Sequence, residues 1–440
     1  MDSNSYSLIR KHIEGVRVID THEHLPPEEE RVREEVDVLA TFFQYYASAD
    51  LISAGMPEEE FVKIWDASRP LEERWELFEP WWERTRNTSY ARALETAARG
   101  LYGVEGISRE TYADLSRRMR ERNRPGLYRW VLGEMSNIEV SILDMGVYEV
   151  DRSFFAPVLE FNEMLRARDR TAMETVGRSE GCRIHTLNDL CGAVRAKFDR
   201  LQGRVVAVKI PTAYSRPLLF EKSSFSEAEE AFNEIYRMRL FKRVEMPPKG
   251  DKRVPADVGA EKLLPLQDYL VHLIIQEAER RGLPVQIHTG LQEGNENIVT
   301  HSRPTHLVNL FMEYGDARFD IFHGGWPYSS ELGALAKNFP NVYIDMCWMH
   351  IISESRARSA LSEWLDEVPA SKIMGFGGDY AFVEGAYGHA VLANENIARV
   401  LASKVEERAF SLDEAKRIAT WLLRDNPLRL FFPRGILAAQ

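Results

Sequence analysis

Two histidines stand two positions apart near the start of the chain, directly after an apolar run. His22 and His24 occur in VIDTHEHLPP, with Glu23 between them and two prolines closing the segment. Side chains alternate along a strand, so both imidazoles would lie on one side while Glu23 points to the other. Neutral imidazole is a common ligand of divalent transition metals. The pair by itself is modest evidence, because a lone histidine after an apolar strand is more often structural.

Further residues with metal-compatible side chains lie at the ends of later apolar runs. They are Lys209 in VVAVKI, His288 in PVQIHT, His323 in RFDIFHG and Asp379 in KIMGFGGD. Taken together with the first pair, they supply the imidazole and carboxylate ligands that a divalent transition metal needs. The sequence therefore predicts a metal site.

Eight short β-rich runs alternate with stretches of helical spacing and length, and these runs must position the site. They cover residues 16–20, 140–145, 154–161, 205–210, 284–289, 318–324, 341–346 and 372–379. Near-continuous apolar strands are typical of a parallel sheet covered on both faces. The pattern predicts an α/β fold, a (β/α)8 TIM barrel in one domain over residues 1–440. Its active site would lie at the carboxyl ends of the strands, where the candidate ligands fall.

Two insertions depart from a minimal barrel. Residues 28–137 form an acidic, aromatic segment of helical pattern, and residues 222–258 form a smaller, charged excursion. The first is expected to pack as a helical cap over one barrel end, where it would wall a substrate pocket. The alternative is a helical layer or dimer surface without ligand contact.

The ordered motifs THEH, QIHTG, FHGGWPY and GFGGDY resemble those of the amidohydrolase superfamily. The phrases VKIPTAYSR and HGGWPYSSELGALAKNFPNVYIDM are most similar to its amidohydrolase-related branch, called amidohydrolase 2, with a distant similarity to uronate isomerases. That branch contains hydrolases, lactonases and nonoxidative decarboxylases, so the resemblance does not determine the reaction.

The resemblance implies that His22, His24, His288 and Asp379 bind one divalent ion, with His323 beside it as a catalytic or orienting group. Zinc is expected, and manganese or iron are the alternatives. A binuclear site stays open, in which a carboxylated Lys209 bridges two ions and His288 and His323 hold the second.

In the expected mechanism the ion polarises a substrate carbonyl and lowers the pKa of water to about 7. Asp379 would take the proton of that water and pass it to the leaving group, while His323 would stabilise the developing oxyanion. Arg216 would bind a substrate carboxylate or make a loop salt bridge. The candidate substrate-binding residues are Tyr214, Arg216, Trp326, Tyr328, His350 and Glu384.

The sequence favours a hydrolase of a small polar, carboxylate-bearing amide, ester or lactone. A nonoxidative decarboxylase or a uronate-type isomerase with the same ion is the alternative. A barrel that serves only as a binding module is disfavoured, because every expected ligand position is filled. The glycines of GFGGD are interpreted as allowing close backbone approach rather than phosphate binding.

Composition limits the partners. The formal net charge of −12 argues against nucleic acid as a partner. The chain has no apolar signal segment and no run of about 18 apolar residues, so we expect a cytoplasmic protein that does not bind membranes. Three cysteines without a C-x-x-C pair are expected to be reduced. A small-molecule substrate and a homodimer are expected.

Overall fold

The computed structural model describes residues 3–237 and 260–435, which form two compact units. The first unit comprises Met1–Ala156, Glu293–Asn295 and Ile344–Gln440, and the second comprises Pro157–Gln292 and Glu296–Tyr343.

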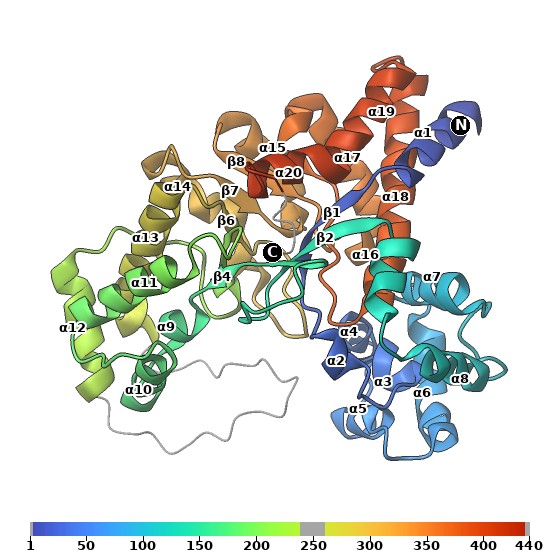
Figure 1. Ribbon diagram of the computed structural model, residues 1–440, viewed down its shortest axis with the longest axis horizontal. Helices are drawn as coiled ribbons and strands as arrows, with labels where there is room; N and C mark the ends of the chain where they lie inside the picture. Colours follow the sequence, from blue (N-terminus) through green and yellow to red (C-terminus); the bar gives the residue numbers. More distant parts are fainter. Residues whose placement is uncertain (1–2, 238–259, 436–440) are drawn as a thin grey trace. The chain divides into compact units, whose positions relative to one another are not determined.

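The strands are short, as Figure 1 shows, and their residues are mostly buried. The strand pairs named below are parallel. In chain order they are β1 (Val18–Glu23), β2 (Ile138–Leu143), β3 (Phe155–Pro157), β4 (Leu159–Glu160), β5 (Val208–Ile210), β6 (Val285–Ile287), β7 (Phe319–Ile321), β8 (Val342–Asp345) and β9 (Ile373–Met374). In the first unit β1 pairs with β2, and β8 pairs with β9. In the second unit β4, β5, β6 and β7 are successive neighbours. Each of the eight predicted runs contains or overlaps a strand, which confirms a parallel α/β fold.

The run at residues 154–161 differs from the prediction, because it forms two strands instead of one. β3 ends at Pro157 and β4 begins at Leu159. Proline has no amide hydrogen and cannot donate to a strand ladder. Pro157 contributes only its carbonyl, which accepts from the amide of Val206 at 3.1 Å. The periodicity of the apolar residues does not show this interruption.

Helices and helical turns fill most of the remaining chain. In the first unit they are α1 (Ser3–Glu14), α2 (Glu28–Arg31), α3 (Val38–Phe42), α4 (Tyr46–Ser53), α5 (Glu58–Trp65), α6 (Leu71–Thr85), α7 (Ser89–Tyr102), α8 (Tyr112–Arg122), η1 (Arg129–Met135), α16 (Met349–Ile352), α17 (Glu354–Glu367), η7 (Ala370–Lys372), α18 (Val383–Glu406), α19 (Leu412–Thr420), η8 (Trp421–Asp425) and α20 (Asn426–Phe431). In the second unit they are α9 (Asn162–Arg166), α10 (Arg170–Ser179), α11 (Leu187–Leu201), η2 (Thr212–Tyr214), α12 (Phe225–Arg237), η3 (Ala260–Leu263), α13 (Leu264–Arg281), η4 (Val299–Ser302), η5 (Pro304–Leu307), α14 (Val308–Glu313), η6 (His323–Gly325) and α15 (Ser329–Asn338).

Local sequence signals explain several helix ends. The side chain of Thr88 accepts a hydrogen bond from the amide of Ala91 and so caps the start of α7, and Gly103 ends α7 with a left-handed φ of 64°. Thr186 and Asp189 form a capping box at the start of α11. These signals set where the helices begin and end, whereas apolar burial sets which face each one turns inward.

Helices α2 to α8 of the first unit, blue to teal in Figure 1, contain an aromatic core of their own. The rings of Phe43 and Phe78 lie 4.4 Å apart between centroids, and Trp82 packs on both. The buried guanidinium of Arg74 donates to Asp37 at 2.6 Å. The aromatic segment predicted at 28–137 is thus largely helical. Of the smaller insertion at 222–258, α12 is described, and residues 238–258 lie outside the described residues.

Within the described part of the chain, no helix combines the length and the apolar character needed to cross a membrane.

Candidate metal centre

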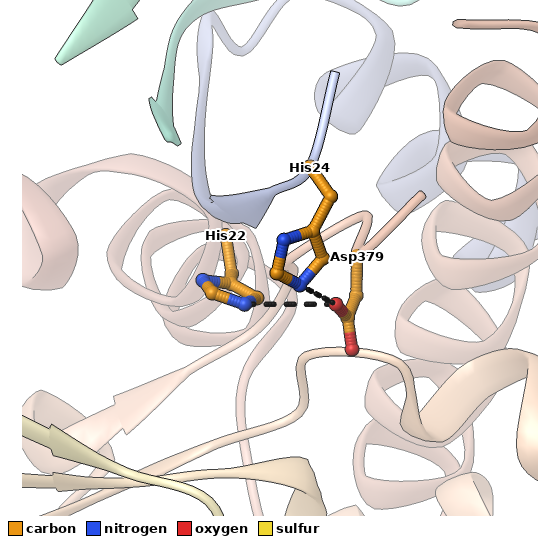
Figure 2. A group of neighbouring side chains, drawn as sticks. All are labelled: His22, His24 and Asp379. Atoms are coloured by element: carbon orange, nitrogen blue, oxygen red, sulfur yellow. Dashed lines mark ion pairs between the residues drawn. The ribbon is translucent and has the colours of Figure 1, made fainter. Parts of the chain in front are cut away.

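Three predicted ligands of the first unit converge on one point, as Figure 2 shows. The Nε2 atoms of His22 and His24 lie 3.6 and 3.2 Å from the same oxygen of Asp379, Oδ1. One ligand atom from each residue lies within 4.8 Å of the others. The donor set of two imidazoles and one carboxylate fits a divalent transition metal such as zinc.

The alternation predicted for the first strand is confirmed. His22 lies inside β1 and His24 follows directly after it, with both rings near Asp379 and their centroids 4.7 Å apart. Glu23 points elsewhere and accepts from the amide of Tyr380 at 2.7 Å. The side chain of His22 is 1% exposed and that of His24 is 29% exposed, so an ion would be approached from the His24 side.

Asp144, at the end of β2, orients His24. Its backbone carbonyl lies 2.7 Å from His24 Nδ1. A carbonyl only accepts, so Nδ1 carries the proton and Nε2 keeps its lone pair toward Asp379. The Asp144 carboxylate also lies 4.0 Å from His22 Nε2. Sequence reasoning missed this residue, although it is a carboxylate that follows an apolar run in VSILDM.

Backbone contacts with β1 hold Asp379 in place. Asp379 has a φ of 57°, in the left-handed region that few residues other than glycine adopt. Its amide donates to the carbonyl of His22 at 2.7 Å, and the amide of Gly378 donates to Asp20 at 2.9 Å. Together with the contact between Tyr380 and Glu23, these bonds fix the turn that presents the Asp379 carboxylate.

Asp20 and Glu23 form a buried acidic pair beneath this turn. Burial raises the pKa of Asp20 to about 6, against hydrogen bonds that lower it. Burial and the charge of Asp20 raise the pKa of Glu23 well above its usual range. Two buried carboxylates in contact cannot both ionise readily, so the pair retains a proton near neutral pH.

The glycines of GFGGD allow the close backbone approach that the sequence predicted. A Cβ atom at Gly377 would lie 2.5 Å from Thr21 Oγ1, and one at Gly378 would lie 1.8 Å from Glu23 Oε1. Both distances are far inside van der Waals contact, so a side chain fits at either position only if the buried side chains of Thr21 and Cys347, or that of Glu23, shift.

We expect Gly378→Ala to destabilise the protein by about 3 kcal/mol, since overpacking a buried site typically costs about 1–3 kcal/mol and this clash is severe. Denaturant unfolding measures the loss. Gly133→Ala is the matched control, because a Cβ there has no neighbour within 4 Å and neither glycine has a positive φ. Equal stability of the two variants would contradict the predicted contact.

Aromatic rings from the helical segment pack beside the chain that carries Asp379. Tyr46 of α4 stacks on Trp348, with ring centroids 4.4 Å apart, and meets Tyr380 edge-on at 5.3 Å. Tyr90 of α7 stacks on Tyr46 at 5.3 Å. All four rings are buried. The segment that follows Asp379 is therefore bordered by apolar surface on its helical side.

Two predicted substrate-binding residues of the first unit are fully buried and bonded inside the protein. Burial lowers the pKa of His350 to about 4, and its Nε2 donates to the carbonyl of Gly375 at 3.0 Å. Glu384 accepts from Arg31 and from the Tyr102 hydroxyl, each at 2.8 Å. A substrate would have to displace these contacts, and the binding role of both residues stays a prediction.

His288 and His323 lie in the second unit and bond to each other. His288 Nε2 is 2.9 Å from the carbonyl of Leu291, so this nitrogen carries a proton. Its Nδ1 then accepts from His323 Nε2 at 2.9 Å. An ion at His288 would replace that hydrogen bond. The predicted roles of His288 as a ligand and His323 as a catalytic group stay predictions.

The other candidates of the second unit surround this pair in different ways. Tyr214 packs on the His288 ring at 4.8 Å between centroids. The buried Lys209 ammonium lies 4.1 Å from the centre of the Phe322 ring. Neither contact tests lysine carboxylation, so the binuclear alternative stays open.

Arg216 was expected either to bind a substrate carboxylate or to make a salt bridge, and in the structure it makes a salt bridge. Its buried guanidinium lies 2.6 Å from Asp268 and donates to the carbonyl of Leu219 at 2.7 Å. Burial lowers the pKa of Arg216. A charge already paired in this way is less suited to a substrate carboxylate.

Trp326 and Tyr328 are partly exposed and have contacts at the end of β7. The Trp326 carbonyl accepts from the amide of Leu291 at 2.7 Å, and the guanidinium of Arg303 lies 5.5 Å from the Tyr328 ring centre. Their predicted contact with substrate stays a prediction.

Comparison with known families finds a similarity in the later part of the chain. The model of the family described as amidohydrolase matches residues 221–432. This later part of the chain, a little under half of its length, is therefore similar to that family. The matched segment includes His288, His323 and Asp379, while His22 and His24 precede it.

One curated relative and several solved structures extend the comparison. Protein fluG of Emericella nidulans is 28% identical over 173 residues, which cover 38% of this chain. The matching part spans only 20% of that longer protein.

Two solved structures of isomerases have a fold similar to that of this chain. One is a uronate isomerase from Thermotoga maritima, which is 14% identical in sequence. The match covers 98% of this chain and 97% of the isomerase chain, with a TM-score of 0.78. A glucuronate isomerase from Caulobacter crescentus (16% identity) covers 99% and 95%, also with a TM-score of 0.78. A provisionally assigned metal-dependent hydrolase from Lactobacillus casei (16% identity) covers 98% and 99%, with a TM-score of 0.61.

Proposed function

We propose that the protein is a metal-dependent isomerase of a small sugar acid, of the uronate type. The observation that carries the proposal is the likeness of fold to two uronate-type isomerases over nearly the whole of both chains. The likeness includes the helical segment 28–137, which a simple barrel lacks. The same fold likeness supports the (β/α)8 barrel as the architecture. This reading replaces hydrolysis, which the sequence favoured, as the leading function.

The geometry of the first unit suits proton transfer. Isomerisation of an aldose to a ketose removes a proton from C2 and adds one at C1, while the C2 hydroxyl proton passes to the C1 oxygen. Water is not consumed. The second carboxylate oxygen of Asp379 points away from both histidines in Figure 2 and would take and return the carbon-bound proton. The packed rings of Tyr46, Trp348 and Tyr380 would exclude water on the helical side.

His22, His24 and Asp379 would hold the divalent ion. When bound, the ion would polarise the substrate carbonyl and make the neighbouring C–H more acidic. The tautomer imposed by the Asp144 carbonyl keeps His24 Nε2 ready as a ligand. Zinc is the expected ion, with manganese or iron as alternatives.

The test is conversion of D-glucuronate by the full chain loaded with Zn²⁺ or Mn²⁺, followed by NMR. We expect the corresponding ketose acid to form, with solvent deuterium appearing at the former aldehyde carbon in D₂O. The chain stripped of metal serves as the control. Absence of ketose with every metal tested would contradict the proposal.

A hydrolase is the second candidate, favoured by the amidohydrolase family match over residues 221–432. Asp379 would then take a proton from water, and the product would gain the elements of water. Turnover of a sugar lactone under conditions in which glucuronate stays unchanged would support hydrolysis instead of isomerisation.

A further inference from the structure

An arginine-rich cavity lies in the helical segment of the first unit. It has a volume of about 440 Å³ and is lined by Arg117, Arg118, Arg122 and Arg124, with Glu121 and the end of α7. All four arginines come from α8 or from the turn that follows it. The cavity therefore gathers like charge from one short stretch of a chain whose net charge is −12.

The positive charge in this cavity is only partly compensated. Arg117 pairs with Asp114 and Glu121 at 2.5 Å, and Arg118 pairs with Asp114 at 2.8 Å. Among the described residues, Arg122 and Arg124 have no carboxylate partner. Four guanidinium groups thus face two carboxylates, which leaves an excess of two positive charges.

A second cavity on the same helical segment provides a contrast. It has a volume of about 480 Å³, and its lining contains three arginines and three carboxylates. The arginines are Arg69, Arg74 and Arg120, and the carboxylates are Glu34, Glu35 and Asp37. Its lining is balanced, so the two cavities differ in the charge of their lining residues.

Some of these arginines also serve the fold. Arg118 donates to the carbonyl of Tyr102 at 2.8 Å and so caps the end of α7. Neither Arg122 nor Arg124 makes such a bond to the end of α7 within the described residues. The Arg122 guanidinium lies over the Trp130 ring at 4.6 Å, a contact that fixes its direction without neutralising its charge.

We propose that the Arg117–Arg118–Arg122–Arg124 cavity binds a small anion that carries phosphate groups. Guanidinium forks match phosphate oxygens through paired hydrogen bonds, and an anion would relieve the repulsion among the four cations. The volume lies within the range of small-molecule sites. A nucleic acid or an anionic membrane is disfavoured, because the net charge of −12 would repel a large polyanion.

The test is calorimetric titration of the full chain with inorganic pyrophosphate at low salt. We expect saturable binding in the submillimolar range that weakens at least about tenfold in Arg122→Gln/Arg124→Gln. Arg120→Gln is the matched control, because Arg120 lies on the same helix and lines the balanced cavity. The control should bind within about twofold of the parent chain.

Arg124→Gln alone keeps the proposal testable if the double variant folds poorly, since Arg124 is exposed and its side chain has no hydrogen bond or ion pair within the described residues. A weakening of at least about threefold is expected for it. Binding that is unchanged in the Arg122 and Arg124 variants would place pyrophosphate elsewhere, for example on the metal, and would overturn the proposal. Absence of binding, or tighter binding to DNA or to anionic vesicles than to pyrophosphate, would also overturn it.

Discussion

Asp379→Asn should lower the turnover number of the metal-loaded protein by about 10³-fold, within the range typical of losing a general acid or base. An amide cannot accept and return a proton at neutral pH. Asparagine has nearly the same size and tolerates the left-handed conformation that Asp379 adopts at φ 57°, so the fold should persist. The measurement is the steady-state rate on D-glucuronate, with thermal unfolding to confirm folding.

The matched control is Asp413→Asn, which changes an exposed carboxylate in the first turn of α19. It should leave the rate within about twofold of the parent protein. If Asp379→Asn kept more than a tenth of the parent rate while folded and loaded with metal, Asp379 would not be the group that moves the proton.

Removal of both strand-end histidines should abolish metal binding. His22→Ala/His24→Ala removes two of the three donor groups that lie together in the first unit. Asp379 alone would bind a transition metal only weakly. We expect metal content after purification with Zn²⁺ to fall from about one ion per chain to below about 0.1. Elemental analysis measures it without knowledge of the substrate, so the result stands even if the isomerase proposal fails.

His185→Ala is the control for histidine removal, since His185 is exposed and precedes α11. It should retain the full metal content. A content of about two ions in the parent chain would favour the binuclear alternative with a carboxylated Lys209. Undiminished metal in the double variant would show that His22 and His24 are not ligands.

Much of the candidate metal centre could be predicted from the sequence, because its first part is local. The spacing of His22 and His24 determines that both rings share one side of β1, whatever the rest of the chain does. The apolar runs likewise located the strands, since continuous burial leaves a mark on composition. The close packing at Gly378 followed from glycine's lack of a side chain.

Other features depend on contacts that no local pattern records. The Asp144 carbonyl selects the His24 tautomer across 120 positions of sequence, and Arg216, in the loop after η2, pairs with Asp268 of α13. Likewise, Glu384 meets Arg31 and Tyr102 instead of standing open to a ligand. Burial and pairing depend on which segments pack together. Sequence spacing does not predict such contacts between residues that are far apart in the chain.

From the sequence alone, one could name the side chains that a metal site would need, namely imidazoles and a carboxylate at the ends of short apolar runs, and could predict a parallel α/β fold. Side-chain type and the period of two are properties of a short stretch, which explains why they could be recognised without the fold. The three-dimensional structure adds that Asp379 lies beside His22 and His24, and that the backbone carbonyl of Asp144 orients His24. These arrangements arise from packing between distant segments, which is where the free energy of folding selects one geometry.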